Sequence, residues 1–570
     1  MAIIFKGYKI ILTALFIMMR RRNKMKKTGI TLLMTLILLT GCYGNNDDTS
    51  ESSKETPTDV KQEINVSLAG ELSTLDSAQY TDVNSSDMIG QVTEGLYRLD
   101  ENGDPELALA SEEPEISEDG LTYTFKLRDT KYSDGSQVKA EDFVYAFQTV
   151  VDPKTASSSS NRMDIFENGR SIREGDKEVS ELGAKAVDDQ TLEIQLEDPQ
   201  PFLPQILTGT PFMPKSKAFA EDKDKTYGTN TDNFLGNGPF VIEGWNGNNL
   251  SFKLKKNDNY WDAENVKLET IDVQVVKEIA TGTSLFTDEQ LDYTVLADTY
   301  AQEYQDSDQA YFVPKALVGY ISPNHKKEVT GNVNLRRAII QAIDKDNFTK
   351  NILADGSTPL NGFVAKDFAK NPETDKDFRE ESGDLMPYDV KAAQASFEKA
   401  KQELGKDEIT LELLSADTAL AKKTIEFLQG QLEQNLPGLT INLKSVPLQN
   451  RLDLQTQSDY DLVFGTWTPD YADPIDFLNF YDSKSGLNSS GYSNEDYDQG
   501  LQEARTTLAN DNQARWDQLI DMEHLLIEED TAVLPFYQGS VAYLKSDRLE
   551  GLQVFPFGRT VSYRLAYVTE

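Results

Sequence analysis

The sequence has few of the side chains that build most catalytic and metal centres. Its 570 residues include one cysteine, Cys42, and two histidines, His325 and His524. A single cysteine excludes an intrachain disulfide, and two histidines without a cysteine pair argue against a dedicated zinc site. His325 follows a turn-like Pro-Asn pair and His524 falls in a helical pattern, so we assign chemistry to neither. We expect no metal site and no cofactor.

The sequence motifs of common enzymes are also absent. The chain contains no Gly-x-x-x-x-Gly-Lys-Ser/Thr phosphate loop, no Gly-x-Ser-x-Gly nucleophile elbow and no His-Glu-x-x-His zinc helix. The cysteine count excludes cysteine nucleophiles. Carboxylates are so numerous that any acid and base pair would be an arbitrary choice, which leaves a glycosidase open on pattern alone. We expect a protein that is not an enzyme.

Positive charge is scarce. The chain has 56 Lys and Arg against 95 Asp and Glu, a formal net charge of −39. The first 41 residues hold eight of the basic residues and no acidic one, so the remainder has 48 basic against 95 acidic residues, a formal charge of −47. Such a chain is repelled by nucleic acids and by anionic lipid headgroups. We therefore expect no nucleic-acid partner and no attachment of the folded part to a membrane surface.

The lone cysteine ends a short apolar segment near the N-terminus. Residues 30–40 are apolar apart from threonine, Met25-Lys26-Lys27 precede them, and Gly41 leads into Cys42. A basic start, an apolar core, small residues and a cysteine are typical of a lipoprotein signal peptide. We predict that residues 25–41 are removed and that lipid on Cys42 anchors the protein to the outer face of the cytoplasmic membrane. The alternative is a buried structural cysteine.

Two further segments flank this signal. Residues 10–19 form a second apolar stretch, which is too short for a membrane span and is followed by three arginines. We predict that residues 1–24 are an over-extended N-terminus and that Met25 is the true start; the alternative is a longer signal peptide with a basic middle. After Cys42 the chain is polar to about residue 62, as expected of a flexible tether.

From Ile64 onward, strand-like and helix-like patterns alternate. The predicted strands are residues 64–68, 121–127, 191–196, 439–446 and 461–464, with a hairpin of residues 238–242 and 250–254. The predicted helices are residues 140–151, 334–342, 392–404, 419–432 and 515–528. This mixture, without internal repeats, predicts an α/β fold.

Four groups of motifs follow one another along the chain. They are residues 109–128 with 132–135 and 138–146; residues 152–157; residues 238–240 with Trp245 and 259–262; and residues 467–474 with Phe477 and Leu478. Each is weak alone, but the ordered set resembles the oligopeptide-binding family, the extracytoplasmic solute-binding proteins (family 5) of peptide ABC transporters. The resemblance runs from about Ile64 to the C-terminus.

The resemblance implies a periplasmic-binding-protein-like (type II) fold. Such a fold has two α/β lobes joined by a hinge, which close over the ligand, and here an additional family-specific lobe. We expect lobe I to comprise residues 63–93, 218–318 and 539–570, the additional lobe II residues 94–217, and lobe III residues 319–538.

The resemblance also implies a ligand-binding residue. Residues 467–471 read Trp-Thr-Pro-Asp-Tyr, and Asp470 matches the family aspartate that pairs with the α-ammonium of the ligand. A buried ammonium needs such a carboxylate partner. The alternative is that Asp470 caps a turn ahead of Asp473-Pro474.

Backbone contacts are implied on both sides of the ligand. Thr466, Trp467 and Thr468 would supply them beside Asp470, and Thr81 and Val83 would supply them from the opposite lobe. The alternatives are a core role for Trp467 and an ordinary surface loop at Thr81 and Val83. Main-chain pairing reads the peptide backbone rather than its sequence and so permits broad specificity.

Two positions depart from the family pattern. Phe464 stands three residues before Trp467, where an arginine that meets the ligand carboxylate can occur, and Ser158 stands where a tyrosine can be found. These positions give no reason to expect an anchor for the peptide C-terminus. We hypothesise that the protein grips the N-terminal end and accepts longer peptides.

The function implied is that of a lipid-anchored, monomeric receptor. It would capture oligopeptides and deliver them to the membrane permease subunits of an ABC transporter with separate ATPase subunits. Three alternatives stay open: a receptor for a signalling peptide, such as a sex pheromone or quorum peptide, using the same permease; a receptor for nickel, haem or a sugar; and an envelope hydrolase. The scarcity of His and Cys weakens nickel and haem, and the fold cannot decide between nutrient and signal.

Overall fold

The computed structural model describes residues 60–469 and 471–569. The predicted signal peptide, Cys42 and Asp470 lie outside the described residues. Within the described part, no helix combines the length and the apolar character needed to cross a membrane.

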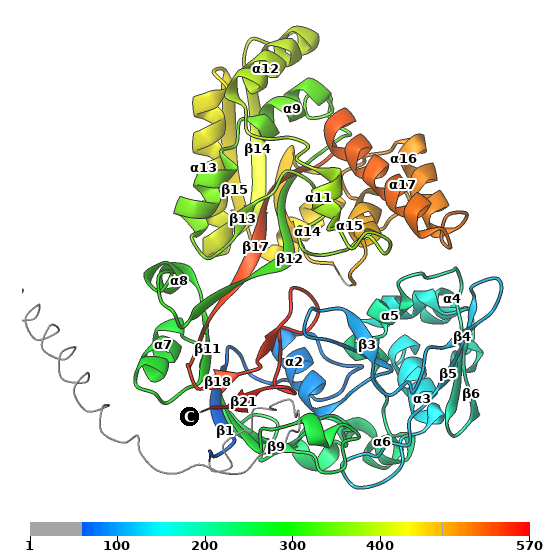
Figure 1. Ribbon diagram of the computed structural model, residues 1–570. Coiled ribbons are helices and arrows are strands. Elements are labelled where there is room, and N and C mark those ends of the chain that lie inside the picture. The colour runs from blue at the N-terminus through cyan, green and yellow to red at the C-terminus, as the bar shows by residue number, and fades with distance from the viewer. Residues whose placement is uncertain (1–59, 470, 570) are drawn as a thin grey trace, which may run out of the picture. The chain divides into compact units, whose positions relative to one another are not determined.

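The fold is organised around an 11-stranded sheet (Figure 1). In spatial order its strands are β15 (Leu439–Val446), β14 (Ile409–Ala416), β16 (Leu462–Trp467), β12 (Ala310–Pro323), β17 (Leu534–Lys545), β11 (Tyr293–Leu296), β1 (Glu63–Leu68), β10 (Thr270–Val275), β9 (Ser251–Lys256) and β8 (Phe240–Glu243), with β13 (Thr358–Pro359) beside β17. The pairs β14–β15, β14–β16, β1–β10 and β1–β11 are parallel, and the other pairs are antiparallel. Outer strands form where apolar and polar side chains alternate in the sequence. In β9, for example, Phe252 and Leu254 are buried between exposed neighbours.

The strands β12 and β17 join the two halves of this sheet. Their antiparallel ladder runs from Ala310↔Leu544 to Pro314↔Ser540, breaks, and resumes from Val318↔Gln538 to Ile321↔Leu534. At the break, Ala316 N donates to Pro556 O at 2.9 Å and Lys315 Nζ donates to Phe555 O at 3.0 Å. The interruption therefore ties the C-terminal segment to the crossing point between the halves.

A separate four-stranded antiparallel sheet has the order β4 (Glu115–Ile116), β5 (Thr122–Lys126), β7 (Thr191–Gln195) and β6 (Ala184–Asp188). Helix α3 (Ala140–Val151) packs on β6 and β7 through its apolar face. Its Phe147 ring lies 5.2 Å from Phe166 and 6.1 Å from Phe212, measured between ring centroids. Three two-stranded sheets pair β2 (Tyr97–Leu99) with β3 (Pro105–Leu107), β18 (Leu549–Glu550) with β21 (Tyr567–Val568), and β19 (Gln553–Val554) with β20 (Val561–Ser562).

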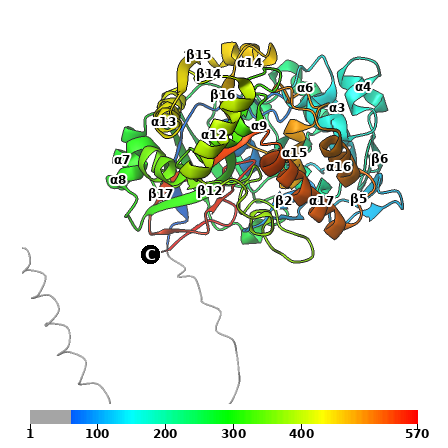
Figure 2. The same cartoon turned by 90° about the horizontal axis from the view of Figure 1, so that it is seen from above.

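Helices cover both halves of the large sheet. The other α-helices are α2 (Val83–Val92), α4 (Gly169–Arg173), α5 (Leu203–Ile206), α6 (Lys217–Lys223), α7 (Ile279–Thr287), α8 (Asp298–Glu303), α9 (Val333–Gln341), α10 (Lys345–Asn347), α11 (Phe378–Ser382), α12 (Val390–Leu404), α13 (Ala419–Asn435), α14 (Leu448–Thr456), α15 (Pro474–Leu478), α16 (Glu495–Arg505) and α17 (Asn512–His524). Short 3₁₀ helices are η1 (Ser160–Ile165), η2 (Val179–Glu181), η3 (Thr210–Phe212), η4 (Asp224–Thr226), η5 (Thr231–Asn233), η6 (Ala263–Asn265) and η8 (Asn479–Tyr481), and η7 (Phe348–Leu353) and η9 (Leu525–Glu529) are π-helical. Helix α13 packs on β14 and β15, and α12 packs on α9 and also contacts α13 (Figure 2).

The ends of these helices follow local rules. Helix α12 begins after Asp389, whose side chain accepts hydrogen bonds from Lys391 N and Ala392 N, and it ends at Gly405, which adopts the left-handed conformation at φ 64°. Helix α17 begins after Asp511, which accepts a hydrogen bond from Ala514 N.

The predicted α/β fold class is confirmed, and so are most of the predicted segments. Residues 140–151 and 439–446 match α3 and β15 to the residue, and the predicted hairpin is formed by β8 and β9. The predicted strand of residues 461–464 was too short, because pairing with β12 extends β16 to Trp467. The predicted helix of residues 515–528 starts at Asn512 because Asp511 caps it, and its last turn is π-helical.

Gly319 of β12 lies where the structure leaves no room for a side chain. A Cβ atom there would lie 1.7 Å from Cε1 of Tyr537, its partner on β17. The Tyr537 ring is buried and packs against Phe348 and Phe536, at centroid distances of 5.4 and 5.1 Å, so it has little room to move.

We expect Gly319→Ala to lower the free energy of unfolding by about 2 kcal/mol or more, as overpacking of a filled core does. The matched control is Gly430→Ala in α13, where a Cβ meets no atom within 4 Å. That control should raise the free energy of unfolding by about 1 kcal/mol, the helix preference of alanine over glycine. Urea unfolding measures both, and a Gly319→Ala protein as stable as the wild type would contradict the packing described.

Candidate ligand-binding site

A cavity of about 280 Å³ lies where segments from distant parts of the chain meet. It is lined by Tyr80, Thr81, Asp82, Val83, Ser86, Leu99, Arg162, Thr208, Gly209, Thr210, Thr468, Pro469, Phe557, Gly558 and Arg559. Thr81, Val83 and Thr468, which the sequence predicted as ligand contacts, therefore line the same cavity. The cavity lining does not include Thr466 or Trp467, the last two residues of β16.

One wall is the beginning of helix α2. Asp82 caps the helix by accepting a hydrogen bond from Ser85 N at 2.8 Å, and its carboxylate also accepts from the hydroxyls of Ser73 and Ser85 at 2.6 and 2.8 Å. These bonds fix the carboxylate in the protein itself. Val83, the first helical residue, is 58% exposed, so an apolar side chain faces solvent beside the cavity.

The opposite wall follows the end of β16. This strand pairs with β12 through Thr466↔Gly319 and Trp467↔Val318, whereas it pairs with β14 only at Leu462 and Val463. The last residues of β16 therefore have one edge outside the β14 ladder.

Trp467 and Thr466 have different surroundings at this strand end. Trp467 is half-buried against Phe480 at a centroid distance of 4.9 Å, and its buried Nε1 has no hydrogen-bond partner within the described residues. Thr466 is exposed.

The segment after residue 470 is held by a buried ion pair. Asp473 caps α15 by accepting from Ile475 N at 2.9 Å, and both its oxygens accept from Arg515, each at 2.8 Å. The cap of α15 is thus Asp473. The Arg515 guanidinium also lies 5.2 Å from the ring centroid of Phe202, and Phe202 stacks on Tyr471 at 4.6 Å. Residues on the C-terminal side of Asp470 are therefore fixed to both α17 and the segment before α5.

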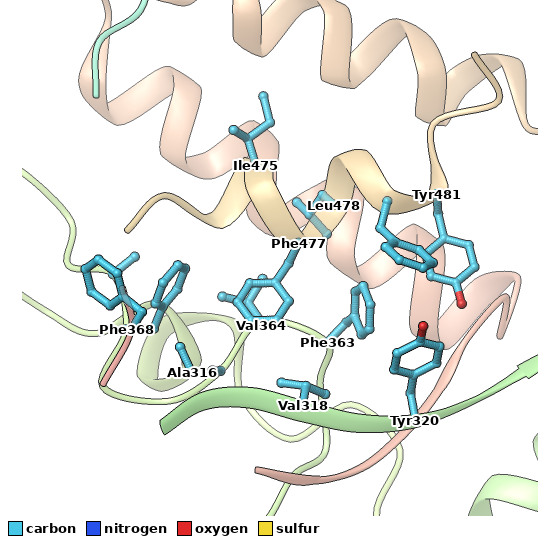
Figure 3. Close-up of a cluster of buried hydrophobic side chains, with 14 of the residues drawn as sticks. Ala316, Val318, Tyr320, Phe363, Val364, Phe368, Ile475, Phe477, Leu478 and Tyr481 are labelled. Atoms are coloured by element: carbon cyan, nitrogen blue, oxygen red, sulfur yellow. The ribbon is translucent and has the colours of Figure 1, made fainter. Parts of the chain in front are cut away.

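An aromatic cluster supports this segment from below (Figure 3). Phe477 of α15 packs on Phe363 and Phe368 at centroid distances of 5.7 and 5.2 Å. Phe363 in turn meets Tyr320 of β12 at 5.7 Å and Tyr481 at 5.5 Å. The cluster connects α15 to β12, one of the two strands that join the halves of the sheet.

The positive groups at the cavity were not predicted. Arg162 comes from η1 and Arg559 from the loop between β19 and β20, and both are half-buried. Phe464 and Ser158, the two departures from the family pattern, make contacts within the protein. Phe464 is buried and its carbonyl accepts a hydrogen bond from Arg451, while Ser158 Oγ donates to Tyr80 O at 3.1 Å. No local motif marks Arg162 or Arg559, because only the folded chain brings them together.

The two histidines make structural hydrogen bonds. His325 Nε2 donates to Ala532 O at 2.9 Å, and burial lowers the pKa of His325 to about 4. His524 donates from Nε2 to Ser382 O at 3.1 Å and lies against Glu528 at 2.8 Å through Nδ1. Within the described residues, no group of three or more His, Cys, Asp and Glu side chains could hold a metal ion.

A buried carboxyl group lies behind the cavity. Asp87 of α2 accepts a hydrogen bond from Thr560 N at 2.5 Å, next to Arg559. Burial raises the pKa of Asp87 to about 6, although the hydrogen bond from Thr560 and the charges of Lys315 and Arg559 oppose the rise.

The raised pKa of Asp87 predicts a pH-dependent stability. The folded protein binds this proton more tightly than the unfolded chain, so the contribution of the neutral form is present at pH 4 and is lost as the pH rises toward 6. Asp87→Asn removes the titration and keeps an oxygen for Thr560 N. The free energy of unfolding of Asp87→Asn relative to wild type should therefore increase by about 2 kcal/mol between pH 4 and pH 7. Urea titrations at several pH values measure this difference, and a constant value would contradict the assignment.

Comparisons with known proteins agree with one another. The family model described as bacterial extracellular solute-binding proteins, family 5 Middle, matches residues 104–489. The dipeptide-binding protein of Lactococcus lactis subsp. cremoris is 32% identical over 562 residues, which cover 95% of this chain and 100% of that protein.

Two solved structures are similar over most of the chain. The structure of Listeria monocytogenes OppA bound to peptide is 40% identical with a TM-score of 0.71, and the match covers 90% of this chain and 99% of that one. The structure of the pheromone receptor PrgZ is 34% identical with a TM-score of 0.72, and the match covers 90% of this chain and 100% of that one. Both similarities extend far beyond the residues of the cavity.

Proposed function

The chain belongs to family 5 of the bacterial extracellular solute-binding proteins, and from that membership we propose that it captures oligopeptides for import by an ABC-type peptide permease. One observation carries the proposal. Thr81, Val83 and Thr468, chosen from sequence as ligand contacts, line one cavity although they lie far apart in the chain. Family members bind solutes, and we propose that this chain likewise binds its peptide without chemical turnover.

In the proposed complex the peptide is extended between the start of α2 and the end of β16. Asp470 pairs with the α-ammonium of the peptide, and Thr466, Trp467, Thr468, Thr81 and Val83 offer backbone contacts. The edge of β16 that extends beyond its pairing with β14 supports this mode, because an extended peptide adds to such an edge through main-chain hydrogen bonds. Tyr471 and Asp473, which follow Asp470 in the chain, are themselves held by Phe202 and Arg515.

The cellular setting is also part of the proposal. Lipid on Cys42 tethers a monomeric protein to the outer face of the cytoplasmic membrane, where it delivers peptide to permease subunits served by separate ATPase subunits. The division into lobe I (residues 63–93, 218–318 and 539–570), lobe II (94–217) and lobe III (319–538) places the hinge at β12 and β17. The interrupted ladder between these strands supports a hinge at that point.

A second candidate function is reception of one signalling peptide through the same permease. The similarity of this chain to the solved structure of the pheromone receptor PrgZ supports this second candidate function. A general receptor binds many unrelated peptides with comparable affinity, whereas a signal receptor prefers one by a large factor. Binding of a mixed peptide library separates the two.

The test of the proposed site uses Asp470→Asn with a peptide that has a free N-terminus and with the same peptide acetylated. Loss of a buried charge pair should weaken the free peptide by about 2–5 kcal/mol, and the acetylated peptide should bind the variant and the wild type equally weakly. Asp496→Asn, an exposed position in the first turn of α16, changes the charge equally and should leave binding unaltered. Calorimetry measures the affinities, and an unchanged affinity of Asp470→Asn for the free peptide would refute the role of Asp470.

A further inference from the structure

One aromatic contact joins two parts of the chain that both contribute to the cavity. The ring of Phe202, in the segment before α5, stacks on the ring of Tyr471 with a centroid distance of 4.6 Å and an interplanar angle of 6°. In the lobe division proposed above, Phe202 belongs to lobe II and Tyr471 to lobe III. We propose that this pair is a latch, which holds the two lobes together over a bound peptide and sets how long the peptide stays bound. The inference rests on the proposed function and on that lobe division.

The latch lies close in the chain to the walls of the cavity. On the side of lobe II, α5 leads from Phe202 to residues 208–210, which line the cavity. On the side of lobe III, residues 468–469 line the cavity just before Tyr471, and Asp470, the proposed partner of the peptide N-terminus, is its direct neighbour. Parting the two rings therefore moves apart two segments of the cavity wall.

The ring of lobe II is held by its own backbone. Phe202 is 8% exposed and stands at the cap of α5, where its carbonyl accepts a hydrogen bond from Gln205 N at 3.1 Å. Pro201 and Pro204 flank it, and each fixes one backbone angle of this short segment. The ring is therefore presented to lobe III in one orientation.

Lobe III holds the other side with a charged group as well as a ring. Arg515 is fixed by its ion pair with Asp473, and its guanidinium lies 5.2 Å from the centroid of the Phe202 ring. A cation at this distance from an aromatic ring is attracted to it, most strongly where water is excluded. Tyr471 and Arg515 of lobe III thus both bind the one ring of lobe II.

An ion pair that joins the same two lobes is weaker than the latch. Lys370 Nζ lies 3.9 Å from Asp104 Oδ2, and the two side chains are 51% and 59% exposed. Ion pairs so exposed contribute little to stability, whereas a stacked aromatic pair gains from its geometry and from the apolar surface that it buries. The latch is therefore the contact that favours the closed arrangement of these lobes.

A contact of this kind should act on the release of peptides and not on their recognition. Neither Phe202 nor Tyr471 is among the residues that line the cavity. A contact between lobes that forms once the peptide is enclosed slows dissociation and leaves the encounter with the peptide unchanged. The effect should be the same for peptides of unrelated sequence.

The experiment measures association and dissociation rates by stopped flow with the full-length protein in detergent. The probes are two pentapeptides, Ala-Ala-Ala-Ala-Lys and Val-Gly-Ser-Thr-Lys, each with a free N-terminus and a fluorophore on the lysine side chain. Phe202→Ala and Tyr471→Ala should each release both peptides about tenfold faster than the wild type. The association rates should stay within about threefold of the wild type.

A double variant distinguishes a shared contact from two separate structural roles. Because both substitutions remove the same contact, Phe202→Ala combined with Tyr471→Ala should release peptide at about the rate of the faster single variant. Tyr471→Phe keeps the ring and should release peptide at the wild-type rate. Phe202→Leu keeps most of the apolar volume, should fold as the wild type does, and should still release peptide about fivefold faster.

The matched control removes a ring from an aromatic pair that lies inside one lobe. Phe219 of α6 packs edge-on against Tyr227 at a centroid distance of 6.3 Å, and both belong to lobe I. Phe219→Ala should leave the dissociation rate within about threefold of the wild type, because loss of this ring does not touch the contact between lobes II and III.

The outcomes separate this inference from the proposed function. If Phe202→Ala, Phe202→Leu and Tyr471→Ala release both peptides at the wild-type rate, if the single effects multiply in the double variant, or if Phe219→Ala accelerates release as much as Phe202→Ala, the latch is overturned while peptide binding stands. If neither peptide binds to the wild type, the proposed function fails and the latch fails with it.

Discussion

The antiparallel pairing of β12 with β17 is the interaction on which the rest of the structure depends. Both halves of the large sheet build outward from it, β16 on one side and β11 on the other. At its interruption, residues 315–317, the backbone N–H of Ala316 donates to Pro556 O and the side chain of Lys315 donates to Phe555 O in the C-terminal segment. These bonds anchor Phe555 and Pro556, which directly precede the residues that line the cavity in this loop, Phe557, Gly558 and Arg559.

Buried charged groups hold two other segments near the cavity in place. The pair of Asp473 and Arg515 fixes the start of α15, and Asp87 fixes the loop beside Arg559. Removing one partner of a buried pair leaves the other charge without compensation, so these contacts set geometry more than they add stability. Stacking of Phe202 on Tyr471 extends the same support to the segment before α5. The walls of the candidate site are therefore held by buried contacts, although its lining residues lie on loops and element ends.

Sequence patterns predicted those helices and strands that are determined by residues close together in the chain. Helix α3 and strand β15 were predicted to the residue because their apolar spacing is local, and the motif order indicated the family. Helix α15 was not predicted, and its cap is Asp473, which accepts a hydrogen bond from Ile475 N and pairs with the distant Arg515. Strands β12 and β17 escaped prediction because their pairing spans more than 200 residues and is broken by a bulge. Arg162 and Arg559 carry no local signal at all.

We propose above all that the cavity between α2 and the end of β16 holds a peptide by its free N-terminus. The most direct test is native mass spectrometry of the protein as purified from its own cells, followed by sequencing of the molecules released from it. We expect bound peptides with unmodified N-termini, either as a ladder of mixed sequences or as one dominant species. Release of a ligand that is not a peptide, or a protein that carries nothing and ignores an added peptide library, would contradict it.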